Sequence, residues 1–332
     1  MKKWTIDMIG SLREKNAIVT GGTDGIGLEI ARELARNGAR VIICADDFTK
    51  GEKASANIRN SMEGALVSYE HLDLSDLESV KVFSERILSE FTQLHLLINN
   101  GGIAAVPERM SSKQGHELIF AVNYLSHFAL TARLFDLLER TPGSRIIFQS
   151  SMEHKQGILD FFDMNATHFY DPSKAYAQSK LAQIVFAREL ARRIRATNLD
   201  MKSIAVHPGA ARTHIFTKGP GLSDKMIRPH DLLSKFLVFS LGQSAARGAE
   251  PALFAATSKF ADSGHYYGPS GYRELRGAPV ERESALQTKN TQAAQKLWDL
   301  SEELTELEFG IRDFSNVLPF EMKSTKTTDA FS

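Results

Sequence analysis

The sequence predicts a single doubly wound α/β domain, built on a parallel sheet of about seven strands with helices on both faces. Short apolar runs of β type alternate with amphipathic helical patterns along most of the 332 residues. No Pro/Gly/Ser-rich linker divides the chain, and no internal repeat is visible. Strands that alternate with helices form βαβ units, whose strands run parallel and are covered on both faces. We therefore expect one domain over residues 1–332.

The expected strands are short runs rich in Val, Ile and aromatic residues: Ala17–Val19, Val41–Cys44, Leu66–Tyr69, Leu94–Ile98, Arg145–Phe148, Ser203–Val206 and His265–Tyr267. Apolar residues at helical spacing predict the helices Ile26–Asn37, Leu77–Glu90, Gly115–Glu139, Ala175–Thr197 and Ala293–Leu307. In the first of these helices Ile30 and Leu34 recur one turn apart, and Gly38 ends the pattern.

Composition excludes several classes of protein. Forty basic and forty acidic residues leave no net charge, whereas a nucleic-acid-binding domain usually carries a basic patch. Cys44 is the single cysteine, so no internal disulfide and no zinc cluster is expected. No run of about 18 apolar residues could cross a bilayer, and Asp7 and Arg13 interrupt any signal-peptide core. We expect a cytoplasmic protein without a metal.

A glycine-rich turn follows the first predicted strand and leads directly into a helix. Its glycines have G-x-x-x-G-x-G spacing, a variant of the dinucleotide-binding fingerprint of Rossmann-type folds. Missing side chains let the backbone approach a pyrophosphate, and the helix N-terminus offers free N–H groups. A plain strand-to-helix turn is the alternative. The residues expected to contact the cofactor here are Gly21, Thr23, Asp24, Gly25, Ile26 and Gly27.

Acidic residues at the end of the second strand indicate which dinucleotide is bound. Asp46 and Asp47 lie about twenty residues after the glycine-rich turn, where a carboxylate can accept hydrogen bonds from the adenosine ribose. Such a carboxylate repels the 2′-phosphate of NADP, and Asp24 adds a negative charge. We expect NAD, with NADP less favoured; solvated acids ahead of a helix are the alternative.

A tyrosine and a lysine lie one helical turn apart. Tyr176 and Lys180 are at i and i+4, so they share one helical face. A free tyrosine has a pKa of about 10 and is a poor base at neutral pH. A nearby ammonium and an oxidised nicotinamide both favour the phenolate. The pair therefore suggests acid–base chemistry, although a surface pair is the alternative.

These motifs occur in an order that resembles the short-chain dehydrogenase/reductase family. Thr20–Gly27 is followed by Asn99–Gly102, by Ser150-Ser151 and by Tyr176–Lys180, and His207–Thr213 resembles the family's segment after the sixth strand. The resemblance implies an oxidoreductase that transfers a hydride between a nicotinamide cofactor and an alcohol/carbonyl pair. An NADPH-dependent carbonyl reductase and a non-catalytic dinucleotide sensor or scaffold remain as alternatives.

The resemblance also implies a role for individual residues. Tyr176 would be the general acid/base, Lys180 would lower its pKa and bind the nicotinamide ribose, and Ser151 rather than Ser150 would hold the substrate oxygen. Asn123 would anchor a water that leads to Lys180. Further residues implied in cofactor binding are Asp73, Leu74, Asn100, Pro208, Gly209 and Thr213. The cofactor half would span about 15–150, the catalytic and substrate half about 151–310, and a polar tail 311–332.

Two departures from the family pattern are visible. Gly101 stands where most members carry alanine, and 25 positions separate Ser151 from Tyr176, more than in compact members. The longer insertion resembles the retinol dehydrogenase-like branch, and within it the motifs look most like a polyprenol dehydrogenase-like member. That branch usually carries Arg where Asp46 stands, so its frequent NADP preference does not transfer to this chain.

Two segments bear on partners. His214–Gln243 mixes Met, Leu and Phe with basic residues, which suits a cover over a lipophilic alcohol or carbonyl such as a steroid, retinoid or isoprenoid. An amphipathic helix on the core is equally compatible, and its basic residues offer a peripheral contact with anionic lipid as a further interpretation. The Ala293–Leu307 helix is expected to pack on the domain, with a homodimer contact as the alternative.

Overall fold

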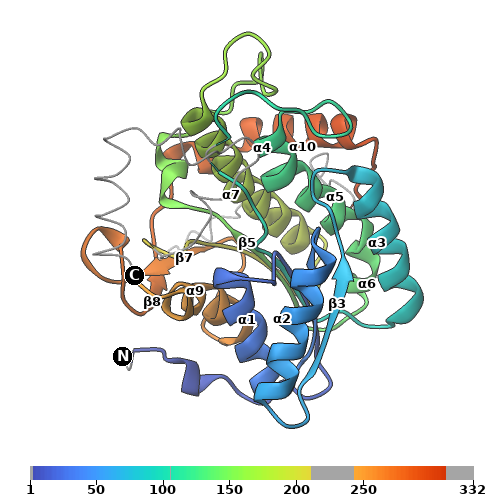
Figure 1. Cartoon of the computed structure of the whole chain (residues 1–332). Coiled ribbons are helices and arrows are strands. Elements are labelled where there is room, and N and C mark those ends of the chain that lie inside the picture. The colour runs from blue at the N-terminus through green and yellow to red at the C-terminus, as the bar shows by residue number, and fades with distance from the viewer. Residues whose placement is uncertain (1–2, 105, 211–242, 312–332) are drawn as a thin grey trace, which may run out of the picture.

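The structure, a computed structural model, describes residues 3–104, 106–210 and 243–311. Its described strands form one eight-stranded sheet in the order β3-β2-β1-β4-β5-β6-β7-β8 (Figure 1). The strands are β1 (Asn16–Thr20), β2 (Arg40–Ala45), β3 (Leu66–His71), β4 (Leu96–Asn99), β5 (Ser144–Gln149), β6 (Met201–Val206), β7 (Tyr266–Pro269) and β8 (Pro279–Glu281). Neighbours from β3 to β7 are parallel, and β8 runs antiparallel to β7.

The longer helices are α1 (Gly25–Arg36), α2 (Phe48–Ser61), α3 (Leu77–Glu90), α5 (Ser126–Arg133), α7 (Pro172–Ala196), α9 (Ala245–Thr257) and α10 (Thr291–Thr305). Shorter turns are α4 (Leu118–Phe120), α6 (Phe135–Glu139), the π-helix η2 (Ala121–Leu125) and the 3₁₀ helices η1 (Ile6–Met8), η3 (Met152–Gln156), η6 (Tyr272–Glu274) and η7 (Leu286–Lys289). Among the described helices, none is long and apolar enough to cross a membrane.

Both faces of the sheet are buried, as the continuous apolar runs predicted. Along β5, Ile146 and Phe148 belong to the core shared with α3, α5, α7 and α10, whereas Ile147 belongs to the core shared with α1, α2 and α9. Successive side chains of a strand point to opposite faces, so each strand supplies both cores. Figure 1 shows the two helical layers on either side of the sheet.

The strand order places a crevice where the site motifs lie. Strand β1 pairs with β2 on one side and with β4 on the other. The chain therefore adds β2 and β3 toward one edge of the sheet and the later strands toward the opposite edge. Ligands of open α/β sheets bind at the carboxyl ends of the strands beside such a reversal. The glycine-rich turn follows β1, and Asn100 follows β4, so both lie at this crevice.

The structure confirms the fold class and refines its elements. The sheet has an additional antiparallel edge strand, β8. The domain also contains two helices that the apolar pattern did not predict, α2 and α9. The helix expected over Gly115–Glu139 begins at Leu118 and is interrupted at Leu134. Residues 211–242, including most of the expected substrate cover, and the tail from 312 lie outside the described residues.

Candidate active site

The glycine-rich turn needs its glycines for both conformation and space. Gly21 and Gly25 have φ angles of 62° and 54°, in the left-handed region that glycine favours. A Cβ on Gly27 would lie 2.3 Å from the carbonyl oxygen of Gly21. Helix α1 begins at Gly25, so its free N–H groups face the turn. This bare backbone beside a helix N-terminus fits a dinucleotide pyrophosphate.

Thr20 joins the turn after β1 to the loop after β4. Its Oγ accepts hydrogen bonds from the backbone N–H of Asn100 at 2.9 Å and of Gly101 at 2.8 Å. The Asn100 side chain donates back to the Thr20 carbonyl at 2.9 Å. A Cβ on Gly101 would lie 2.7 Å from Cδ1 of Leu74, the flexible end of that side chain. Leu74 therefore lies beside this loop, directly after Asp73 in the chain.

The acidic residues expected at the adenosine ribose lie beside a lysine. Asp46 is exposed at the end of β2, and Asp47 caps α2 by accepting from the Lys50 backbone N–H at 2.9 Å. The Lys50 ammonium also pairs with Asp47 at 2.6 Å. The pKa of Lys50 is raised by Asp47 first and also by Asp46 and Asp24. Both charge signs are thus present at this edge of the sheet.

Helix α7 places Tyr176 and Lys180 on one buried face beneath the loop that follows β5. Ser151 forms a hydrogen bond with the Tyr176 phenol, while burial raises the pKa of Tyr176 to about 12. Ser150 points elsewhere, because its hydroxyl donates to the Lys180 carbonyl at 2.7 Å. The structure therefore brings Ser151 to the phenol, and gives Ser150 a contact with the backbone of α7.

The Lys180 ammonium is buried and held by two acceptors. Its Nζ donates to the Gln149 carbonyl at 2.9 Å and to Oε1 of Gln183 at 3.1 Å. It lies 5.7 Å from the centre of the Tyr176 ring. Burial lowers the pKa of Lys180 to about 7. The charged state of this lysine thus depends on its few acceptors.

Asn123 lies in the π-helix η2, a geometry that often occurs at functional sites. Its Oδ1 accepts from the Ile103 backbone N–H at 2.8 Å, and its Nδ2 donates to Oγ of Ser179 at 2.9 Å. Its carbonyl accepts from Nε2 of Gln183 at 2.7 Å. Gln183 therefore connects the backbone of Asn123 to the Lys180 ammonium. The signal in the sequence that could have identified Gln183 is its polar side chain three positions after Lys180, on the same side of the helix.

His127 connects this cluster to the cofactor turn. Its Nε2 lies 3.0 Å from Oγ of Thr20, and its Nδ1 lies 3.0 Å from the carbonyl oxygen of Asn123. Burial lowers the pKa of His127 to about 4, so the ring is neutral. The Asn123 carbonyl can only accept, so the ring carries its proton on Nδ1. Its Nε2 is then an acceptor for the Thr20 hydroxyl, which also lies 3.3 Å from the Ile98 carbonyl oxygen. Sequence analysis did not identify His127.

The Pro208–Gly209 segment after β6 lies at the same end of the sheet. Gly209 has a φ angle of 68°, and its N–H donates to Nδ1 of His207 at 3.2 Å. The Pro208 carbonyl accepts from Nε2 of Gln243 at 2.6 Å. Thr213, expected to contact the cofactor, lies outside the described residues.

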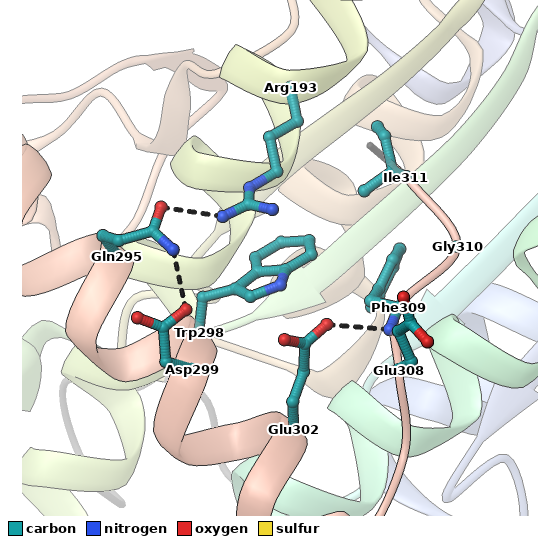
Figure 2. A pocket seen from close by; sticks show the side chains of 9 residues that line it. All are labelled: Arg193, Gln295, Trp298, Asp299, Glu302, Glu308, Phe309, Gly310 and Ile311. Atoms are coloured by element: carbon teal, nitrogen blue, oxygen red, sulfur yellow. Dashed lines mark hydrogen bonds between the residues drawn. The ribbon is translucent and has the colours of Figure 1, made fainter. Parts of the chain in front are cut away.

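A cavity of about 540 Å³ lies away from this site (Figure 2). Its lining comes from α10, the segment 308–311 and Arg193, whose guanidinium lies 3.7 Å above the Trp298 ring. Arg193 follows Tyr176 by 17 positions on α7, about 25 Å along a helix that rises 1.5 Å per residue. Within the parts of the chain that the structure describes, no cluster of side chains could hold a metal ion.

Fold and site together define an NAD(P)-type oxidoreductase of the short-chain class. The sequence matches the family profile described as short chain dehydrogenase over residues 15–220, and the chain belongs to this family. As a member, it is an NAD(P)-dependent oxidoreductase acting on CH–OH groups.

Individual relatives confirm the expected branch. The chain is 36% identical to retinol dehydrogenase 12 of Mus musculus, covering 87% of this chain and 86% of that protein. Retinol dehydrogenase 13 of Homo sapiens is also 36% identical, with 89% and 85% covered. A crystal structure of an uncharacterised protein from Mycobacterium paratuberculosis matches with a TM-score of 0.76 and 32% identity, covering 93% of this chain and 99% of that one.

Proposed function

We propose that this chain interconverts a lipophilic alcohol and its carbonyl compound, with Tyr176 as the general acid/base. The observation that carries the proposal is the convergence of three groups: the Tyr176 phenol hydrogen-bonds Ser151, and the Lys180 ammonium lies on the same helical face. A substrate oxygen beside Ser151 and Tyr176 would accept the serine hydroxyl and exchange its proton with the phenol. Bound nicotinamide supplies the hydride acceptor or donor.

The tyrosine must ionise for alcohol oxidation, and its surroundings pull in both directions. Burial favours the neutral phenol, since it raises the pKa of Tyr176 to about 12. The Lys180 cation favours the phenolate, and so does the positive charge of an oxidised nicotinamide. Lys180 would also donate its remaining N–H to the nicotinamide ribose. Gln183 and Asn123 hold this ammonium in place.

The cofactor that we propose is NAD, with NADP as the second candidate. Asp46 and Asp24 support NAD because a carboxylate at the adenosine ribose repels a 2′-phosphate. Lys50 supports NADP, because its ammonium lies near Asp46 and Asp24 and would attract a 2′-phosphate bound there. The residues proposed to hold the dinucleotide are Gly21, Thr23, Asp24, Gly25, Ile26, Gly27, Asp46, Asp73, Leu74, Asn100, Tyr176, Lys180, Pro208, Gly209 and Thr213.

A retinoid alcohol is the substrate that the relatives favour. The mouse and human proteins that cover most of this chain are named retinol dehydrogenases. The apolar residues of His214–Gln243 suit any lipophilic substrate, so steroid and isoprenoid alcohols are the further candidates. A cytoplasmic location, a peripheral membrane contact and a homodimer stay as predictions.

Turnover of purified protein tests the proposal. The full chain is incubated with NAD⁺ or NADP⁺ and a panel of retinoid, steroid, polyprenol and small alcohols, and the reduced cofactor is followed by absorbance. We expect Tyr176→Phe to bind cofactor normally and to lose at least about 10²-fold in kcat, the usual contribution of general acid–base catalysis. A kcat within a few-fold of the parent would remove Tyr176 from this role.

A further inference from the structure

A strained turn follows β7. In η6, Arg273 and Glu274 have φ angles of 48° and 60°, in the left-handed region, although neither is glycine. Residues in this conformation are strained, and they persist where the surroundings hold them, often at functional sites.

The Glu274 carboxylate connects two segments that are far apart in the sequence. Its Oε1 accepts a hydrogen bond from Nζ of Lys155 at 2.7 Å, and its Oε2 lies 3.1 Å from Nε2 of His207. Lys155 lies in η3, four residues after Ser151, and His207 directly precedes Pro208. The neighbouring His207 and Lys155 side chains lower the pKa of Glu274 to about 2, so it is charged.

The Nε2 atom of the His207 ring lies close to this carboxylate. Its Nδ1 accepts the Gly209 N–H at 3.2 Å, which leaves the proton of the neutral ring on Nε2. The ring is fully buried and stacks on Tyr266 with centroids 5.2 Å apart. Burial lowers the pKa of His207, which keeps the ring neutral. A Cβ on Gly268, in strand β7, would lie 1.7 Å from Nε2 of His207. Only glycine at this position leaves room for the imidazole ring.

The backbone of the same turn also contacts the Pro208–Gly209 segment. The Ala210 N–H donates to the Leu275 carbonyl at 2.9 Å. A Cβ on Gly209 would lie 2.5 Å from that carbonyl oxygen and 2.8 Å from the carbonyl oxygen of Glu274. The strained turn thus packs directly against Gly209, one of the residues expected to contact the cofactor.

We propose that Glu274 is a positioning residue for hydride transfer, which ties the segment after Ser151 to the Pro208–Gly209 segment and so sets the geometry of the nicotinamide end of the site. The inference rests on the proposed function. Ser151 is proposed to hold the substrate oxygen and Pro208–Gly209 to contact the cofactor, so a shift between the two segments would change the hydride transfer distance. A misplacement of about 1 Å can cost on the order of 10²-fold in rate.

The position of Glu274 predicts a selective effect on cofactor binding. The adenosine end of the cofactor is expected beside Asp46, after β2, on the far side of β1, β4, β5 and β6 from Glu274. Loss of the carboxylate should therefore weaken binding of a complete dinucleotide and leave binding of its adenosine half unchanged. A residue that only stabilises the fold would produce no such separation.

The experiment compares Glu274→Gln and Lys155→Met with the parent. Calorimetry gives the affinity for ADP-ribose, which lacks nicotinamide, and fluorescence gives the affinity for NADH. If the parent prefers NADPH, the 2′-phosphorylated forms replace both ligands. We expect Glu274→Gln to lower kcat and NADH affinity by about tenfold or more and to leave ADP-ribose affinity within about twofold. Lys155→Met should have a smaller effect of the same kind, because its side chain is 43% exposed.

Glu281→Gln is the matched control. Glu281 carries the same charge on the adjacent strand β8, is 62% exposed, and pairs with His265 rather than with the site. It should leave kcat and both affinities unchanged. Equal weakening of ADP-ribose and NADH in Glu274→Gln, or a lower melting temperature with unchanged kcat and NADH affinity, would refute the positioning role. A parent that oxidises no alcohol refutes the proposed function instead, and the two affinities still test Glu274.

Discussion

Gln183 offers the sharpest test of how the lysine is kept charged. Its side chain accepts from the Lys180 ammonium at 3.1 Å and donates to the Asn123 carbonyl at 2.7 Å. Gln183→Met keeps the length of the side chain and removes both hydrogen bonds. The ammonium then retains the Gln149 carbonyl as its remaining acceptor among the described residues.

The size of the effect follows from the lost hydrogen bond. A hydrogen bond to a charged group contributes about 1.5–3 kcal/mol, and one pKa unit corresponds to about 1.4 kcal/mol. The pKa of Lys180, already lowered to about 7 by burial, should fall further by about one to two units. At pH 7 the charged fraction then drops from about one half to below about one tenth. The phenolate loses its nearest cation, so oxidation slows by about tenfold.

The assay is the pH dependence of kcat/KM for alcohol oxidation. The limb that reports Lys180 falls as pH rises, because the ammonium form is the active one. Gln183→Met should move this limb to lower pH. Gln183→Glu keeps an acceptor and adds a negative charge, so it should move the same limb to higher pH. Identical profiles for both variants and the parent would refute the role of Gln183.

Three further outcomes are expected. Lys180→Met should shift alcohol oxidation to higher pH by at least about one unit, because the phenolate loses its nearest cation; an unchanged pH–rate profile would place this control elsewhere. Ser151→Ala should lower kcat more than Ser150→Ala, whose hydroxyl contacts the backbone of α7 and whose loss should chiefly lower the melting temperature; the reverse ranking would reassign the substrate contact. The parent should favour NAD⁺ over NADP⁺ by at least about tenfold in kcat/KM, a difference of about 1.4 kcal/mol, and Asp46→Arg should narrow or invert that ratio; a parent that prefers NADP⁺ would contradict this.

Elements with a local signature were predictable, and those without one were missed. Strands buried on both faces read as apolar runs whatever their neighbours are. Helix α2 has no stripe of large apolar residues that would predict a helix. Its buried residues are mostly small: Gly51, Ala54, Ser55 and Ile58. A Cβ on Gly51 would lie 2.0 Å from the Tyr69 ring, so this helix approaches β3 too closely for larger side chains. Its pairing with the sheet depends on this close fit, which periodicity does not detect.

The sequence by itself determined the fold class, the cofactor turn and the pairing of Tyr176 with Lys180. Each depends on residues close in the chain: glycines that permit a left-handed turn, or two side chains one helical turn apart. These features therefore appear in the order and spacing of residues alone.

Only the tertiary structure decided which polar groups support those residues. Gln183 bonds to Asn123 across 60 positions, His127 reaches Thr20 across 107, and Glu274 binds Lys155 across 119. A buried polar side chain must find a hydrogen-bond partner, but its partner is fixed by how helices and strands pack. In the sequence these residues look like any polar residue on a helix or in a loop, and the fold alone brings them to the site.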